Sequence, residues 1–269
     1  RGIGGISALD YLVKVRGLDF VTAVEAVMGK AAEIPSFIFP EKRKVYDRLF
    51  VPRYTFSCNQ AKKYLLVRGI DESIIDECIS KKLIAENLKD GAVLFFGYDE
   101  KGVLKHCCSR DTDGKSGKKD MAGSDKRYAF RLADNESNHT VRVFESAIDL
   151  LSYATMLKDM GKDYHTENLI SLSGIYLPKE QVEETKIPMP LEHYLATHPN
   201  TKKICLYLDN DFAGRRGADA LQVIFGGKYE VKYIPPPDGK DYNDYLMITK
   251  QIKFKNERNE NRENSDQKR

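Results

Sequence analysis

Two short apolar stretches that end in acidic residues decide the fold: Val141-Arg142-Val143-Phe144-Glu145 and Ile204-Cys205-Leu206-Tyr207-Leu208-Asp209-Asn210-Asp211. Each has the length and the β-branched or aromatic content of a strand buried in a sheet. In open α/β sheets the carboxyl ends of the strands meet at one edge, and ligands bind there. We therefore expect Glu145, Asp209 and Asp211 to lie close together although they are far apart in the sequence.

Strands and helices alternate from Thr140 onward. A helical pattern covers residues 147–160, and apolar strand patterns cover residues 169–172, 204–208 and 231–234. Such alternation is typical of a parallel sheet with helices on its faces. We predict an α/β domain over residues 139–249, with a Rossmann-like parallel sheet flanked by helices.

Residues 51–138 have a different pattern, in which helices are followed by a β-hairpin and then by a basic segment. Between residues 101 and 131 there are nine Lys or Arg and four Asp. An isolated charge run is more often a solvated loop, but a basic run also suits the phosphates of a nucleic acid. We predict a basic α+β domain whose candidate nucleic-acid and nucleotide ligands are Arg110, Lys118, Lys119 and Lys126.

The two ends of the chain are expected to stand apart from these domains. Apolar residues recur at three- and four-residue steps over residues 7–28, which predicts a small helical segment within residues 1–50. Residues 250–269 are almost all charged or amide, which predicts a disordered tail.

Composition limits the class of protein. The chain has 269 residues, 41% of them hydrophobic, and a formal net charge of only +3, so a nucleic-acid surface must be a local patch. The five cysteines are scattered without a C-x-x-C pair, which suggests reduced thiols. We find no apolar run long enough to span a membrane and no signal peptide, so we expect a cytoplasmic protein.

The acidic residues need a cation if they come together. Taken singly, Asp209 and Asp211 are ordinary helix N-caps and Glu145 complements a helix dipole. Asp149 lies one helical turn after Glu145, and Asp241 follows the last predicted strand. Grouped carboxylates raise one another's pKa, whereas their hard oxygens suit Mg²⁺ or Mn²⁺. The group therefore predicts a phosphoryl-transfer site with metal ligands among Asp209, Asp211, Asp149 and Asp241.

Three motifs carry a resemblance to a known family: Glu145 with Asp149, Asp209-Asn210-Asp211 with Ala213-Gly214, and Gly239-Lys240-Asp241. Together they resemble the Toprim domain of DnaG-type primases, topoisomerases and related nucleases. The resemblance implies that Glu145 is a catalytic acid or base and that Asp209 and Asp211 bind Mg²⁺. Replicative primases have Asp-Pro-Asp in the third motif, whereas the second carboxylate position here is Asn243, an uncharged oxygen donor.

The resemblance extends beyond the acidic domain. Residues 61–131 are similar to the basic amino-terminal half of the primase core. Residues 2–28 look like the end of a primase zinc-binding domain, which implies that any zinc ligands lie upstream of Arg1. The order resembles mobile-element primase-like proteins, in which a domain of unknown function precedes Toprim.

The function implied by this resemblance is a primase-like nucleotidyltransferase. Its partners would be a single-stranded DNA template and ribonucleoside triphosphates, with a helicase or relaxase as a further partner. One alternative is a metal-dependent Toprim nuclease of the overcoming-lysogenization-defect type. Another is a nucleic-acid-binding accessory protein with a vestigial site, which Asn243 favours and the retained Glu145, Asp209 and Asp211 oppose. A topoisomerase is disfavoured because no tyrosine lies in a recognisable motif.

Overall fold

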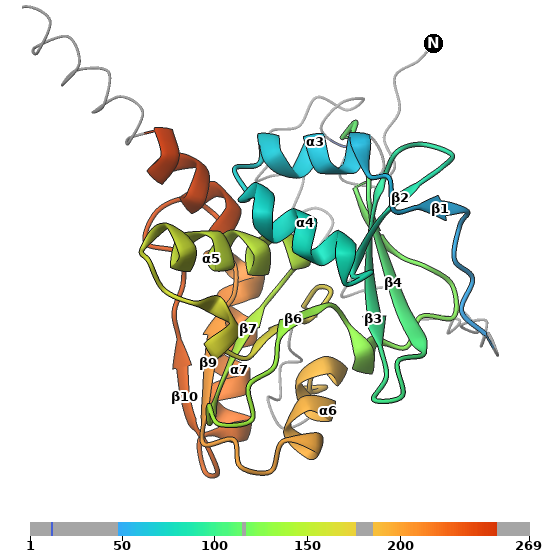
Figure 1. Cartoon of the computed structure of the whole chain (residues 1–269). Coiled ribbons are helices and arrows are strands. Elements are labelled where there is room, and N and C mark those ends of the chain that lie inside the picture. Colours follow the sequence, from blue (N-terminus) through green and yellow to red (C-terminus); the bar gives the residue numbers. More distant parts are fainter. Residues whose placement is uncertain (1–11, 13–47, 115–116, 176–184, 252–269) are drawn as a thin grey trace, which may run out of the picture. The chain divides into compact units, whose positions relative to one another are not determined.

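The computed structural model describes residue 12 and residues 48–114, 117–175 and 185–251 (Figure 1). The predicted helical segment at 7–28, apart from the helical Leu12, and all but the first two residues of the predicted tail lie outside this described part. Contacts divide the chain into Arg1–Val45 and Tyr46–Arg269. The two sheets described below belong to the second of these units.

The amino-terminal part of this unit is an antiparallel sheet with strand order β1-β2-β3-β4-β5. Its strands are β1 (Tyr54–Thr55), β2 (Ile84–Asn87), β3 (Val93–Tyr98), β4 (Leu104–Arg110) and β5 (Lys118–Asp120), and its helices are α3 (Asn59–Val67) and α4 (Glu72–Ser80). The predicted hairpin is β3–β4. Asp71 caps α4, because its carboxylate accepts hydrogen bonds from the backbone amides of Ser73 and Ile74.

The carboxyl-terminal part is a mixed sheet with strand order β10-β9-β7-β8-β6. Four neighbouring strands are parallel, and β6 runs antiparallel to β8. The strands are β6 (Arg131–Ala133), β7 (Thr140–Phe144), β8 (Leu169–Ser171), β9 (Lys203–Tyr207) and β10 (Glu230–Tyr233). The helices are α5 (Ala147–Asp159), α6 (Met189–Thr197), α7 (Phe212–Phe225), two single turns, η1 (Lys126–Tyr128) and η2 (Tyr164–Thr166), and residues 242–251. The predicted α/β class is confirmed.

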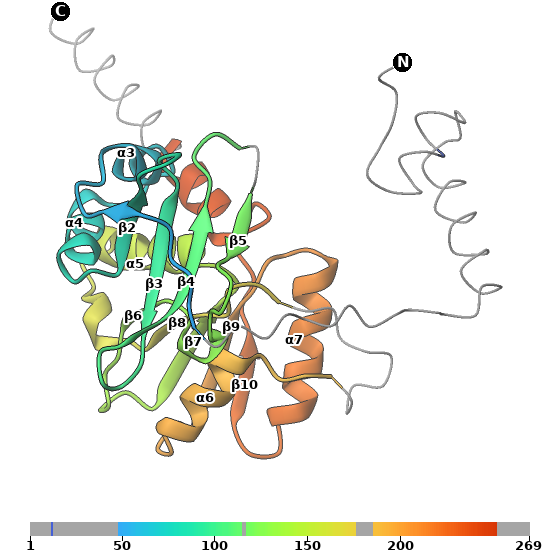
Figure 2. The same ribbon diagram turned by 90° about the vertical axis from the view of Figure 1, so that its right-hand side faces the viewer.

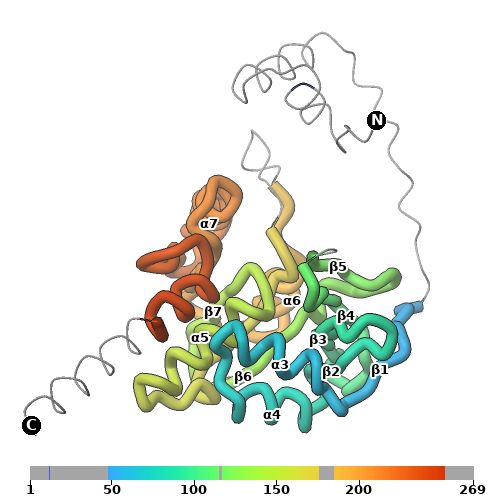
Figure 3. The backbone as a smooth tube through the Cα atoms, turned by 90° about the horizontal axis from the view of Figure 1, so that it is seen from above, coloured from blue at the N-terminus to red at the C-terminus, as the bar shows by residue number. Residues whose placement is uncertain are grey.

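Helices cover both faces of this second sheet because its central strands are apolar on both sides. In β7, Val141 and Val143 pack with α6 and α7, whereas Phe144 packs in the core that contains α5. Neighbouring β9 repeats the alternation. Seen from above, α5 and α7 lie on opposite sides of β7 (Figure 3).

The two sheets share one hydrophobic core. Ile74 and Ile75 of α4 and Phe95 of β3 belong to the same buried cluster as Leu150 and Leu151 of α5. The views agree that the first sheet lies beside the second (Figures 1 and 2). A shared core fixes the two sheets against each other, so basic residues of the first can face acidic residues of the second.

No helix among the described residues is long and apolar enough to cross a membrane. The five cysteines are all free and buried, in agreement with the prediction of reduced thiols.

Candidate metal and nucleic-acid site

Glu145, Asp209 and Asp211 lie at the carboxyl edge of the parallel sheet. Glu145 directly follows β7, and Asp209 lies two residues after β9. These strands are direct neighbours, with Phe144 opposite Tyr207. Asp211 is the N-cap of α7, where its Oδ1 accepts a hydrogen bond of 2.9 Å from the amide of Gly214. The order of the strands therefore places the three acids at one edge of the sheet.

Asp149 and Asp241 lie beside this edge, but Asp149 is buried beneath it. The Asp149 carboxylate accepts a 2.5 Å hydrogen bond from Ser146 Oγ and a 3.3 Å bond from the Asn243 amide. Asp241 precedes the helical residues 242–251, and its Oδ1 accepts a 2.8 Å hydrogen bond from the amide of Asp244. Burial raises the pKa of Asp149 to about 7, and the charge of Asp241 adds to the rise.

The acids differ in how readily they ionise. Burial raises the pKa of Glu145 to about 7, and the charge of Asp209 adds to the rise, while Lys118 opposes it. Burial also raises the pKa of Asp209, with Asp241 as the next cause. The hydrogen bond from Gly214 lowers the pKa of Asp211. Glu145 can therefore exchange a proton near neutral pH, while Asp211 stays ionised.

Lys240 bridges the two aspartates of the second motif. Its Nζ lies 3.4 Å from Asp209 Oδ2 and 3.3 Å from Asp211 Oδ2. Among the described residues, no three His, Cys, Asp or Glu side chains are grouped so that they could hold a metal together. Mg²⁺ usually takes only one or two carboxylates and completes its shell with water and phosphate oxygens. Asp209 and Asp211 supply two carboxylates, and both already interact with the Lys240 ammonium. This pair therefore fits the donor set that Mg²⁺ uses.

Asn243 takes no part in this donor set. Its Oδ1 accepts a 2.8 Å hydrogen bond from Arg68 Nη1, and its Nδ2 donates to the Arg68 carbonyl and to Ser152 Oγ, each at 2.9 Å. The side chain is 3% exposed. The side-chain oxygen of Asn243, which the sequence suggested as a metal ligand, is therefore already hydrogen-bonded to Arg68.

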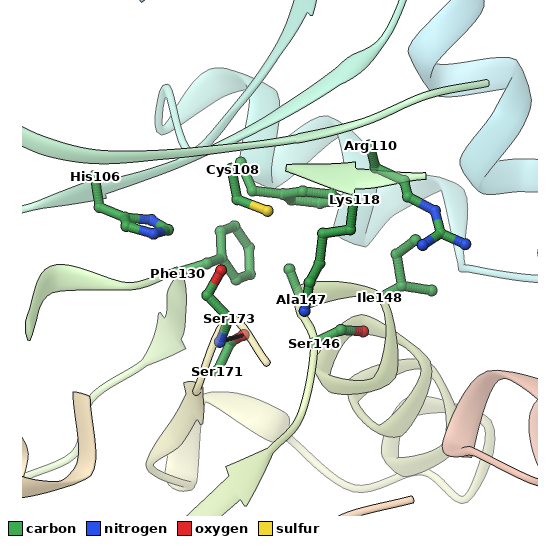
Figure 4. A pocket seen from close by; sticks show the side chains of 11 residues that line it. His106, Cys108, Arg110, Lys118, Phe130, Ser146, Ala147, Ile148, Ser171 and Ser173 are labelled. Carbon is green, nitrogen blue, oxygen red and sulfur yellow. Dashed lines mark hydrogen bonds between the residues drawn. The ribbon is translucent and has the colours of Figure 1, made fainter. Parts of the chain in front are cut away.

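A small pocket of about 30 Å³ lies next to Glu145, between the β4–β5 hairpin and the start of α5 (Figure 4). Arg110 and Lys118 enter it from the first sheet, and Ser146 lines it at the N-terminus of α5. Two cations and a helix N-terminus make this wall electropositive. The basic sheet and the acidic edge therefore meet at one place.

The other two predicted basic residues are placed differently. Lys119 follows Lys118 on β5, and successive strand residues face opposite sides, so Lys119 points away from the side that Lys118 faces. Lys126 Nζ lies 2.9 Å from Asp120 Oδ2 and donates to the Ser173 carbonyl at 3.3 Å. The structure brings only Arg110 and Lys118 to the pocket.

Sequence reasoning missed a buried polar group in the lining of the pocket. Ser173, at a positive φ of 53°, donates a 2.7 Å hydrogen bond to Asp120 Oδ1. His106 is fully buried, and its Nε2 lies 3.3 Å from the same oxygen, yet neither ring nitrogen completes a hydrogen bond. The only sequence signal was the alternation of β5, which places Asp120 on the same face as Lys118.

Family models match both halves of the described unit. Residues 142–246 match the Toprim-like family, and residues 63–137 match a family described as a protein of unknown function, DUF3991. The fold and the acidic edge thus define a Toprim-like domain, and the expectation of a Toprim domain is confirmed. More particularly, the chain carries a DUF3991 region followed by a Toprim-like domain.

One curated relative is an uncharacterized protein of Bacillus anthracis, 29% identical over 238 residues. The match covers 82% of this chain and 64% of the relative, so the chain spans less than two thirds of the relative's length.

Similar solved structures include the primase fragment of the bacteriophage T7 primase-helicase protein, with 19% identity and a TM-score of 0.47 over 81% of this chain and 80% of that one. Another is a DnaG primase catalytic domain bound to single-stranded DNA, with 14% identity and a TM-score of 0.46 over 75% of this chain and 71% of that one.

Proposed function

We propose that this chain is a primase-like, metal-dependent nucleotidyltransferase that copies single-stranded DNA from ribonucleoside triphosphates during replication of a mobile element. The observation that supports it best is the meeting of two surfaces, one from the DUF3991 region and one from the Toprim-like domain. The acidic edge of Glu145, Asp209 and Asp211 lies next to the pocket that Arg110 and Lys118 enter. Phosphoryl transfer needs such opposed charges, because it requires cations around the phosphates and a base at the attacking hydroxyl.

The side chains divide these tasks. Asp209 and Asp211 would hold Mg²⁺ or Mn²⁺, which when bound supplies positive charge against phosphate oxygens. Glu145, with its pKa raised to about 7, accepts the proton of an attacking hydroxyl near neutral pH. Arg110 and Lys118, which line the pocket, would contact nucleotide or template phosphates beside the acidic edge.

The basic wall has a further consequence for binding. Affinity for single-stranded DNA that depends on Arg110 and Lys118 falls steeply as salt increases, because phosphate contacts release counterions. A helicase or relaxase that delivers the template remains a prediction from the resemblance alone.

The deciding experiment is primer synthesis on single-stranded DNA with labelled ribonucleotides and Mg²⁺. We expect short RNA from the wild type and a loss of roughly 100-fold or more in Glu145→Gln and in Asp209→Asn. Asp219→Asn, on the exposed side of α7, is the matched control and should keep full activity.

Two results would redirect the assignment. Cleavage of DNA with Mn²⁺ in the absence of any RNA synthesis would identify a Toprim nuclease that uses the same acids. Binding of single-stranded DNA without synthesis or cleavage would identify an accessory protein.

A further inference from the structure

The backbone of Lys240 is held by a hydrogen bond, whereas its side chain is exposed and makes ion pairs. Its carbonyl accepts a 2.7 Å hydrogen bond from the amide of Asn210, inside the Asp-Asn-Asp motif. The preceding Gly239 has φ of 79°, and a side-chain carbon there would lie 2.7 Å from Asp244 Cβ, so glycine is required at this turn. The side chain is 57% exposed, and its ammonium reaches both Asp209 and Asp211.

The Lys240 ammonium and a divalent metal bound to Asp209 would repel each other. Mg²⁺ binds carboxylate oxygens at about 2.0–2.1 Å. A metal on Asp209 Oδ2 would lie at most about 5.5 Å from Nζ, because Nζ is 3.4 Å from the same oxygen. Like charges at that range repel, and metal binding also takes up the carboxylate charge that holds the ammonium. A long, half-exposed lysine can relieve the conflict by rotating outward.

We propose that Lys240 is a displaceable counter-ion that couples metal loading to substrate binding. Before metal binds, its ammonium neutralises Asp209 and Asp211; when metal binds, the released ammonium contacts a phosphate of the substrate. This inference rests on the proposed function, because it takes the two aspartates as metal ligands.

The position of Lys240 favours a phosphate as its second partner. The backbone of Lys240 is tied to the Asp-Asn-Asp loop, so the released ammonium stays at the rim of the acidic edge. Substrate phosphates must reach that edge to complete the metal shell. Lys240 would then add a positive charge there only after the carboxylates have been neutralised.

The first measurement is Mn²⁺ affinity without nucleic acid, from the electron paramagnetic resonance signal of free Mn²⁺. Lys240→Met keeps the length of the side chain and removes its charge. We expect it to bind Mn²⁺ about tenfold more tightly than the wild type, because two ion pairs no longer have to be broken. Lys89→Met, at an exposed turn of the first sheet, is the matched control and should bind like the wild type.

The second measurement is the affinity for a fluorescein-labelled single-stranded oligonucleotide with and without Mn²⁺. In the wild type, Mn²⁺ should strengthen binding by both neutralising the acids and releasing Lys240. In Lys240→Met the gain from Mn²⁺ should be several-fold smaller. Equal urea midpoints for the two proteins would show that the variant is folded.

The outcomes separate this inference from the proposed function. If Lys240→Met binds Mn²⁺ with the affinity of the wild type, or more weakly, the counter-ion role is wrong. If Asp209→Asn binds Mn²⁺ as well as the wild type, the metal site is wrong and the inference falls with it. Tighter Mn²⁺ binding in Lys240→Met would support the counter-ion role even if the wild type makes no RNA. The absence of RNA synthesis by the wild type would refute the primase proposal.

Discussion

Replacing Asp149 with Asn should reverse the order of stability of the variant and the wild type between pH 4 and pH 8, in the absence of metal. Asp149 is 5% exposed, and burial together with the charge of Asp241 raises its pKa from 3.8 to about 7. Because the folded-state pKa is the higher one, the folded state favours the protonated carboxyl. Stability from this group is therefore complete below pH 4 and is lost as pH rises toward 7.

The magnitude follows from the size of that rise. A pKa raised from 3.8 to about 7 corresponds to about 4 kcal/mol against ionising Asp149 in the folded protein. The asparagine side chain of the variant never ionises, but it loses part of the hydrogen bonding with Ser146 and Asn243, at a cost of about 1 kcal/mol. We expect the variant to be about 0.5 kcal/mol less stable at pH 4, where the unfolded wild type is already partly ionised, and about 3 kcal/mol more stable at pH 8.

The assay is urea denaturation of both proteins in EDTA at the two pH values, followed by circular dichroism. Asp219→Asn, an exposed aspartate on α7, controls for the loss of one negative charge. A free-energy difference between wild type and Asp149→Asn that stays the same at pH 4 and pH 8 would refute the reasoning, because it would mean that folding does not change the ionisation of Asp149.

Three further substitutions test the packing that supports the site. Asn243→Ala removes three side-chain hydrogen bonds, one buried and two partly buried, and should cost about 2–4 kcal/mol in urea unfolding; a cost below about 0.5 kcal/mol would argue against a structural role. Gly97→Ala would place a carbon 1.6 Å from the Tyr128 carbonyl oxygen, so its melting temperature should fall markedly; an unchanged melting temperature would show that the close approach is absent. Arg142→Ala breaks hydrogen bonds of 2.8 and 2.9 Å to Glu167 and leaves a mostly buried carboxylate without its cation, so we expect a loss of about 3 kcal/mol; full recovery by Arg142→Lys would contradict the bidentate geometry.

The parallel sheet could be predicted because its signals are local. Its central strands are mostly apolar, and an acid follows β7 directly and β9 after one further residue. Parallel strands place their carboxyl ends at one edge whatever their order. The edge of the sheet that carries the acids could therefore be predicted without knowing the strand order. The closeness of Glu145 to Asp209 needs more, because it depends on β7 pairing directly with β9.

Some elements of the site could not be predicted from the sequence, because they depend on contacts with residues elsewhere in the chain. The strand β5 is Lys-Lys-Asp, which has no apolar residue, and it forms by antiparallel pairing with β4, in which Lys118 lies opposite Arg110. A polar triplet in isolation indicates a loop. The partner of Lys126 could not be predicted either, because the position of Asp120 beside it depends on the pairing of β5 with β4. The phosphate-binding expectation for Lys126 was drawn from charge alone and could not include this pairing.

The link between the two sheets explains why the basic half belongs to the site. The amide of Gly174 donates a 2.8 Å hydrogen bond to the carbonyl of Glu145, and the adjacent Ser173 donates to Asp120 on β5. The backbone that carries the candidate base is thus tied, through one turn, to the strand that carries Lys118. A displacement of β5 would move Lys118 and disturb the support of Glu145 together, so the charge that holds phosphate and the group that accepts the proton are positioned as one unit.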